Sequence, residues 1–472
     1  MVFSSGIFLF VFLPIFLAAY YLTPTKWRSG LILVSSYSFY AWWRMDFLAL
    51  LAGITVVAYG FALAIERNED QKTRFRLLSV AVILNLAALA YFKYTNFGVE
   101  ALNAALEGLG AKAFNWTPIL LPIGLSFFIF HAISYLVDIY RKEARPTESI
   151  IDFAAFIALY PHLIAGPVLR YHLLAEQFRN REHSWDRFSR GSARFMLGFA
   201  KKVLLADTVA PLADAAFNLE WATAADAWLG ALAYTAQIFF DFSGYSDMAI
   251  GLALMIGFEF PENFNHPYAS RSITDFWRRW HISLSSWLRE YLYIPLGGNR
   301  FGEARTYFNL SMTMVLGGLW HGANWTFIVW GAWHGGILAI ERYLKGSKRA
   351  PMSTWITIPG TFLLVMVGWI FFRSADMGEA TRVLMGMAGV NGFALSDALA
   401  FQISGLEISA LIGAAIVTIA GGWWAEFQTA RQQLKPAQSR VTWGLYVIPA
   451  LFVISVMRMM AQSYSPFLYF QF

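Results

Sequence analysis

Apolar runs of membrane-crossing length recur along almost the whole chain, separated by short polar links. They cover residues 6–22, 30–43, 46–65, 77–95, 118–139, 151–168, 193–210, 227–241, 246–260, 309–322, 324–343, 354–372, 404–424 and 442–461. About 20 apolar residues cross a hydrocarbon core of roughly 30 Å, so the pattern predicts a polytopic membrane protein. Some runs are shorter than about 17 residues. We therefore expect about 10 to 13 crossings together with re-entrant or interfacial helices.

The runs are continuous rather than alternating, which indicates helices and argues against a transmembrane barrel. No soluble domain or short repeat interrupts them, so we predict an all-α protein with a single integral-membrane domain over 1–472. Within it we expect N-terminal helices in 1–140, a catalytic core in 141–345 and C-terminal helices in 346–472. Pro161, Gly166 and Pro167 predict a break inside YPHLIAGPVLR, and the basic, amphipathic stretch 171–190 predicts an interfacial segment.

Composition agrees with this picture, because 57% of the residues are hydrophobic and 14% are charged, against about a quarter charged in a globular chain. The net charge of +6 is more typical of positive-inside loops than of nucleic-acid binding. We place the basic clusters 67–76, 141–145, 345–349 and 431–440 on the cytoplasmic side. No basic residue precedes the first apolar run, whereas Lys26 and Arg28 follow it, which predicts an uncleaved first helix with a periplasmic N-terminus. The terminal AQSYSPFLYFQF would lie at the outer face.

The candidate chemistry is concentrated in 276–334. The chain has no cysteine, so a nucleophile or base must be histidine, serine, tyrosine or a carboxylate. A histidine inside an apolar run is costly to retain, which makes His321 of LGGLWHGANW a functional candidate, although a packing histidine is the alternative. Gly317, Gly318 and Gly322 would allow close backbone approach around it, and Asn324 would orient its ring. No HExxH or histidine–carboxylate spacing indicates a metal site.

The segment FWRRWHISLSSWL places four apolar residues on one helical stripe, namely Phe276, Trp280, Leu284 and Trp287. An interfacial helix with snorkelling arginines explains the segment structurally. The functional interpretation is that Arg278 and Arg279 attract an anionic ligand and that His281 faces the same cavity. A second WHG places His334 13 residues after His321. On one continuous helix these two histidines would lie about 220° apart, unless the glycines break that helix.

Two carboxylates, Asp241 and Asp247, lie in apolar surroundings in FFDFSGYSDMAIG. They suit a proton relay or substrate site, and equally an ion pair that joins helices. The following PENFNHPY, residues 261–268, predicts a polar turn that lines a cavity.

These residues resemble the membrane-bound O-acyltransferase family, and within it the branch that serves bacterial alginate O-acetylation. Relatives in cellulose acetylation and teichoic-acid D-alanylation are further off. The similar segments are MVFSS, YFKYTNFG, PHLIAGPVLR, DFSGYSDMAIGLALMIGF, ENFNHPY, SITDFWRRWHISLSSWLREYLYIPLGGNR, LGGLWHGANW and AQSYSPFLYFQF. The resemblance implies a conical many-helix bundle with a central tunnel, a catalytic His321 and a second functional histidine at His281. Trp320, Asn324, Arg278, Arg279, Asp241 and Asp247 are the candidate substrate-binding or donor-binding residues.

The resemblance also implies transfer of an acetyl group from a cytoplasmic donor, acetyl-CoA, toward an exported polysaccharide, with His321 as general base. No permanently bound cofactor is expected. Expected partners are a periplasmic SGNH-type O-acetyltransferase, polysaccharide-secretion components and the lipids of a bacterial inner membrane. A short polar segment around 428–440 departs from the longer loop of alginate enzymes, which leaves acetylation of cellulose or another polymer as an alternative. A transporter or flippase of an acyl carrier is the rival class, but no paired broken helices indicate one.

Overall fold

The computed structural model describes residues 1–345, 353–432 and 444–461, and this part of the chain is helical, without strands. The predicted all-α class is confirmed. The chain divides into two compact units. Unit 1 comprises Met1–Ser192 and Ala249–Pro261, and unit 2 comprises Ala193–Met248 and Glu262–Phe472. The predicted position of the terminal AQSYSPFLYFQF concerns residues that, after Ala461, lie outside the described part.

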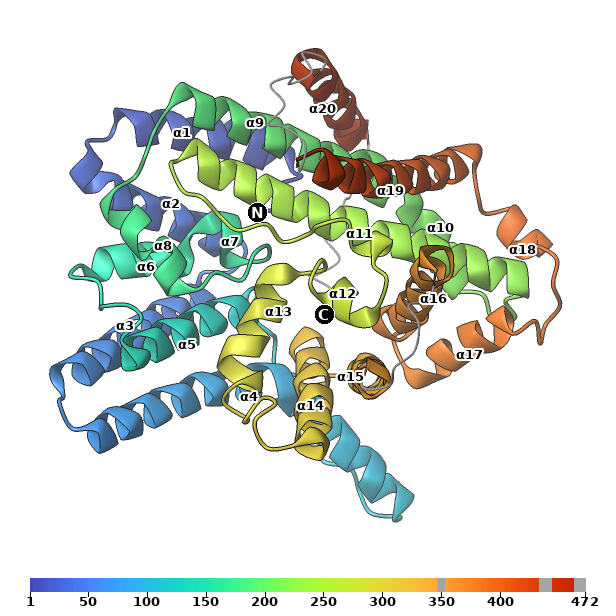
Figure 1. Cartoon of the computed structure of the whole chain (residues 1–472), viewed down its shortest axis with the longest axis horizontal. Coiled ribbons are helices and arrows are strands. Elements are labelled where there is room, and N and C mark those ends of the chain that lie inside the picture. Colours follow the sequence, from blue (N-terminus) through green and yellow to red (C-terminus); the bar gives the residue numbers. More distant parts are fainter. Residues whose placement is uncertain (346–352, 433–443, 462–472) are drawn as a thin grey trace. The chain divides into compact units, whose positions relative to one another are not determined.

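Unit 1 begins with a π-helical stretch, Phe8–Phe12, and contains most of the N-terminal helices (Figure 1). These are α1 (Leu13–Leu22), α2 (Arg28–Ala41), α3 (Asp46–Arg67), α4 (Gln71–Gly108), α5 (Leu125–Arg141), α6 (Ile150–Ala158), α7 (Tyr160–Leu163), α8 (Tyr171–Arg179) and the first part of α9 (Trp185–Ala200). Polar caps fix some of the starts, because Asp70 accepts from Thr73 N before α4 and Ser149 accepts from Ile151 N before α6.

Unit 2 takes the rest of α9 and continues it through a π-helical stretch, Lys201–Ala206. Its helices are α10 (Asp207–Phe217), α11 (Ala224–Met255, up to Met248), α12 (Ile273–Trp277), α13 (Ile282–Leu288), α14 (Glu303–His321), α15 (Trp325–Lys345), α16 (Thr354–Arg373), α17 (Met377–Met387), α18 (Asp397–Ala400), α19 (Gly405–Gln432) and α20 (Gly444–Ala461). A π-helical stretch, Arg289–Tyr293, extends α13. All the histidines of the 276–334 region belong to this unit.

Five of the described helices are long and apolar enough to cross a membrane, namely α3, α4, α11, α16 and α19. Two shorter apolar helices, Phe8–Leu22 and Tyr446–Ala461, fall below that length. The chain is therefore a multi-pass membrane protein by the character of its helices. The expected number of membrane crossings, about 10 to 13, stays a prediction.

The two runs 227–241 and 246–260 were predicted as separate helices, and this is wrong, because α11 continues through the first run and into the second, as far as Met255. Gly244, which lies between the two runs, packs α11 closely against α9 and does not break the helix. A Cβ atom on Gly244 would lie 2.7 Å from the carbonyl oxygen of Gly198, and one on Gly198 would lie 2.5 Å from that of Gly244. Glycine at both positions permits a close helix contact at this point.

The predicted break in YPHLIAGPVLR is confirmed. Helix α6 ends at Ala158, the single-turn helix α7 begins at Tyr160 with Pro161 in its first turn, and non-helical backbone follows from Ile164. Proline fits the first turn because its missing N–H has no helical partner there. The run 151–168 is therefore two short helices and not one crossing.

Candidate active site

His321 is the last residue of α14, at the turn of a tight helical hairpin formed with α15. Glycines set the spacing of this hairpin. A Cβ atom on Gly318 would lie 2.2 Å from the carbonyl oxygen of Phe327, and one on Gly331 would lie 2.4 Å from that of Met314. Neither helix backbone can yield that much, so both positions require glycine. The predicted close backbone approach near His321 is present.

The helix breaks at Gly322, which has extended backbone, and α15 begins at Trp325. Because the helix is broken between His321 and His334, the two histidines can face the same site. The indole of Trp330 lies between them, with its ring centroid 5.3 Å from that of His321 and 5.1 Å from that of His334. His334 is fully buried, and its ring also lies edge-on to Trp277 at 5.3 Å.

His281 lies between α12 and α13 with a left-handed backbone, φ 43° and ψ 52°. The continuous helix implied by the stripe of apolar residues is wrong, since α12 ends at Trp277 and α13 starts at Ile282. The stripe itself is buried, however: Phe276, Trp280, Leu284 and Trp287 are all at most 5% exposed. Burial of these side chains does not need an uninterrupted helix.

Asn263 holds this turn in place from the PENFNHPY segment. Its backbone carbonyl accepts from Ile282 N at 3.0 Å. Its side-chain Oδ1 accepts from Ser283 N at 3.2 Å and Ser283 Oγ at 2.8 Å, while its Nδ2 donates to Ser246 Oγ at 3.0 Å. A positive φ in a non-glycine residue persists only where its surroundings impose it. Asn263 supplies that constraint, and sequence reasoning did not single it out.

The rings of His281 and His321 lie 6.2 Å apart, centroid to centroid, within an aromatic enclosure. Trp320 contacts both rings, at 6.1 Å and 4.9 Å, and Phe242 and Phe372 cover the outer sides of His281 and His321 at 4.7 Å and 5.2 Å. His281 is fully buried and His321 is 6% exposed. Two buried histidines whose rings lie this close together, largely shielded from water, can act together on one reacting group.

Glu341 ties α15 to the segment that leads to His281. Its carboxylate accepts from Ile273 N and from Thr274 N and Oγ1, and so caps the first turn of α12 together with Ser272. An anionic side chain is favourable at a helix N-terminus. Glu341 stands seven residues after His334, on the same helical face, and that spacing was the signal by which the sequence could have revealed it.

The candidate donor-binding residues have different surroundings. Arg278 is exposed, whereas Arg279 pairs through Nε with Asp275 at 2.9 Å. The amide of Asn324 donates to the carbonyl of Ala375 at 2.7 Å, and its Oδ1 accepts from Thr326 N. These are its hydrogen bonds within the described ranges. Asn324 therefore uses its side chain to cap α15. Its expected role in orienting His321 stays a prediction.

Asp241 and Asp247 form ion pairs with the α9 side of unit 2. Lys202 Nζ lies 2.7 Å from Asp241 and 2.6 Å from Asp207, and Lys201 Nζ lies 2.6 Å from Asp247. Arg194 also contacts Asp247. Of the two interpretations left open, these contacts favour ion pairs that join helices.

Three further histidines, His131, His162 and His172, have local partners in unit 1. His131 stacks on His162 at 4.4 Å, and His131 Nε2 accepts from Leu169 N. His172 Nδ1 lies 2.8 Å from Asp138 Oδ2. Asp138, Glu143 and His172 are the one group in the described residues whose ligand-type atoms lie within 4.8 Å of one another, and that ion pair accounts for two of the three.

Comparison with known proteins gives a consistent assignment. The family described as "MBOAT, membrane-bound O-acyltransferase family" matches residues 32–376. The "Probable alginate O-acetylase AlgI" of Pseudomonas putida is 52% identical, and that of Pseudomonas aeruginosa is 48% identical, each over 100% of both chains. The "Peptidoglycan O-acetyltransferase" of Helicobacter pylori is 35% identical over 84% of this chain and 81% of the relative.

Proposed function

Because this chain belongs to the membrane-bound O-acyltransferase family, we propose that it transfers acetyl groups for the O-acetylation of alginate, with acetyl-CoA as donor. Support for the polymer comes from the relatives about half identical over their whole length, which are named alginate O-acetylases. Support for the chemistry comes from a single structural observation. The buried rings of His281 and His321 lie 6.2 Å apart inside an aromatic enclosure.

In the proposed reaction, an acceptor hydroxyl attacks the carbonyl carbon of the thioester. His321 accepts the hydroxyl proton as the new C–O bond forms. The tetrahedral oxyanion then collapses, the C–S bond breaks, and the proton passes from His321 to the leaving thiolate. One C–O bond forms, one C–S bond breaks, and one proton moves from the hydroxyl to the thiolate, so the reaction needs no further reactant.

His281 has a different proposed role, as a hydrogen-bond donor to the oxygen that gains charge in the tetrahedral intermediate. A donor fixed in place before the reaction stabilises such an oxyanion strongly in a site without bulk water. The backbone constraint from Asn263 and the ring contacts with Phe242 and Trp320 give His281 that fixed position.

Arg278 is the proposed contact for the donor's phosphates, because it is exposed and makes no ion pair within the described residues, whereas Arg279 pairs with Asp275. A guanidinium donates bidentately to phosphate. Arg278→Gln should therefore raise the KM for acetyl-CoA and change kcat little.

The acetyl donor is cytoplasmic, and exported polysaccharide is modified outside the inner membrane. We therefore propose that the protein lies in that membrane and passes acetyl groups to a periplasmic SGNH-type partner. The basic clusters of the polar links, which by the positive-inside rule belong to the cytoplasm, support this orientation.

The experiment is acetyl-CoA turnover by the purified protein in nanodiscs, comparing wild type with His321→Gln and His281→Gln. Loss of a general base or of an oxyanion contact lowers turnover by about 10²-fold or more. His172→Gln is the matched control, since it removes a histidine paired elsewhere, in unit 1. Size exclusion establishes that each variant is folded.

Equal turnover by wild type and His321→Gln would overturn the catalytic assignment. Turnover that requires the added periplasmic partner, and that still disappears in His321→Gln, would support the assignment and the partner together. Movement of an acyl carrier across the nanodisc without cleavage of the thioester would instead establish a flippase.

A further inference from the structure

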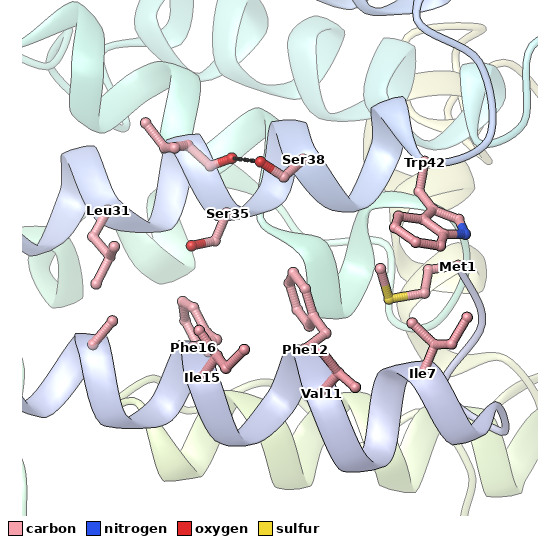
Figure 2. Close-up of a pocket in the computed structure, with 12 residues that line it drawn as sticks. Met1, Ile7, Val11, Phe12, Ile15, Phe16, Leu31, Ser35, Ser38 and Trp42 are labelled. Atoms are coloured by element: carbon pink, nitrogen blue, oxygen red, sulfur yellow. Dashed lines mark hydrogen bonds between the residues drawn. The ribbon is translucent and has the colours of Figure 1, made fainter.

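An apolar groove runs between α1 and α2 in unit 1 (Figure 2). Its volume is about 360 Å³, which lies within the size range of ligand sites. The lining residues come from the N-terminus, from one side of the first helix and from one side of α2: Met1, Ile7, Val11, Phe12, Ile15, Phe16, Ala19, Leu31, Val34, Ser35, Ser38 and Trp42. The hydroxyl of Ser38 donates to the carbonyl of Val34 and so adds little polarity.

The groove opens on the apolar outer surface of these helices. Ile15 and Val34 are each 65% exposed, and Trp42 is 60% exposed. In a membrane protein such side chains face lipid, because they have no favourable contact with water. An elongated apolar groove open to lipid is suited to an acyl chain.

One end of the groove leads to a group of basic residues at the turn between α1 and α2. Arg28 is one helical turn before Leu31, and its Nη1 lies 3.3 Å from Nε2 of His183. Its guanidinium also covers the ring of Tyr20 at 5.0 Å. Tyr20 Oη in turn lies 2.9 Å from His183 Nε2.

A second guanidinium, that of Arg181, reinforces the positive charge. It contacts Ser29 Oγ and lies over the rings of Phe178 and Phe258 at 5.2 Å and 5.0 Å. Neither Arg28 nor Arg181 pairs with a carboxylate in the described part of the chain. The pKa of His183 is lowered by its partial burial and by the positive charges of Arg28 and Arg181. This direction agrees with an excess of positive charge around His183.

We propose that this is a binding site for an anionic phospholipid, with one acyl chain in the α1–α2 groove and the phosphate on Arg28. The exposed Trp27 and Lys26 next to Arg28 complete a polar–aromatic rim of the kind found at membrane interfaces. Charge complementarity selects an anionic headgroup, and the apolar lining of the groove favours an acyl chain. The proposal is independent of the acetyl-transfer reaction.

The test is native mass spectrometry of the full-length protein, stripped of lipid in detergent and then titrated with phosphatidylglycerol or with phosphatidylcholine of the same chains. Wild type should retain phosphatidylglycerol preferentially. Arg28→Gln should weaken that binding by about fivefold, the effect of one basic residue near a membrane surface. Ser35→Phe, which fills the groove, should weaken the binding of both lipids.

Arg76→Gln is the matched control, because Arg76 is an exposed arginine elsewhere in unit 1. It should bind phosphatidylglycerol as wild type does. Equal affinity for the two lipids, or unchanged phosphatidylglycerol binding in both Arg28→Gln and Ser35→Phe, would overturn the proposal. Binding of glycerol phosphate that is as tight as that of the intact lipid would also overturn it, since the groove would then contribute nothing. If Arg28→Gln does not fold, Ser35→Phe decides the question alone.

Discussion

A buried asparagine determines the position of a histidine 18 residues further along the chain. The side chain of Asn263 accepts two hydrogen bonds from Ser283, and its carbonyl accepts one from Ile282, so the left-handed turn at His281 depends on it. Without the side chain, the backbone N–H and the hydroxyl of Ser283 lose their hydrogen bonds to Asn263, and the loss of buried hydrogen bonds costs about 1–3 kcal/mol. The turn is then free to relax toward an ordinary backbone.

We therefore expect Asn263→Ala to lower kcat for acetyl transfer by about 10²-fold, as small displacements of catalytic groups do, while KM for the donor changes little. Asn309→Ala is the control, because Asn309 is a fully buried asparagine of the same unit that donates to the loop carbonyls of Leu296 and Gly298. It should lower stability by a similar amount and affect kcat far less. Equal losses of kcat would show that Asn263 acts only through stability.

His172 provides a test that depends on pH. Its hydrogen bond to Asp138 raises the pKa of the imidazole above its usual value. The folded protein therefore binds this proton more tightly than the unfolded chain, whose histidine pKa is about 6.5. The stabilisation is fully present below that value and is lost as the pH rises through the pKa of the folded state.

Thermal unfolding in detergent should accordingly show wild type to be more stable than His172→Gln at about pH 5.5, by about 1 kcal/mol, because His172 is partly exposed and solvent screens the pair. The difference should shrink as the pH approaches about 9. A difference that is constant over this range would mean that the ion pair does not contribute, and that only packing is lost.

At this scale the sequence identified His321 and His281 as candidates because an ionisable residue in apolar surroundings is conspicuous. It did not reveal the constraint on His281, since Asn263 acts from a separate polar turn and only the tertiary structure brings the two together. Asn324 is close to His321 in sequence and has a side chain that could bond its ring, but its amide donates to the backbone carbonyl of Ala375. Proximity in sequence does not determine which group a side chain bonds.

Among the elements, the hairpin of α14 and α15 carries the site and depends on contact between backbones. A Cβ atom on Gly331 would lie 2.4 Å from Met314 O, whereas one on Gly336, in the same helix, would meet nothing within 4 Å. The two glycines therefore differ in packing and not in helix propensity.

Gly331→Ala should destabilise the protein by about 1–3 kcal/mol, the usual cost of overpacking, and should lower turnover because it displaces Trp330 beside His321. Gly336→Ala should be neutral or stabilising by up to about 1 kcal/mol, because alanine favours the helix. Melting temperatures of the two variants, measured together in detergent, check this. Similar melting temperatures would mean that the helices separate without cost.

The predictions of elements succeeded where apolar periodicity coincided with a strong stop signal, as at Pro161 and at the glycines around His321. They failed where small residues had two possible uses. The separate runs 227–241 and 246–260 suggested two helices, yet α11 continues from Ala224 to Met255, with Gly244 packed against Gly198. Conversely, the apolar stripe predicted for one helix is buried, although the helix is interrupted at His281, where Asn263 bonds the turn.

For the whole molecule, the charge distribution predicts the orientation on which the proposed transfer from cytoplasm to periplasm depends. Helix α4 is the clearest element for a test. It has 38 residues, so at about 1.5 Å per residue it is far longer than the roughly 30 Å core of a bilayer. Its start lies in the basic cluster 67–76, and the loop after its end carries the exposed Lys112.

The natural sequence contains no cysteine, so a single introduced thiol can be labelled without background. In intact cells, a maleimide that enters the periplasm but not the cytoplasm should label Lys112→Cys and leave Glu69→Cys unlabelled until the inner membrane is permeabilised. Both positions are exposed, so burial does not limit either reaction. The opposite pattern would invert the predicted orientation and place the basic clusters outside, against the positive-inside rule. Labelling of both sites in intact cells would mean that α4 does not cross, and an acetyl group would then need another route to the periplasmic acceptor.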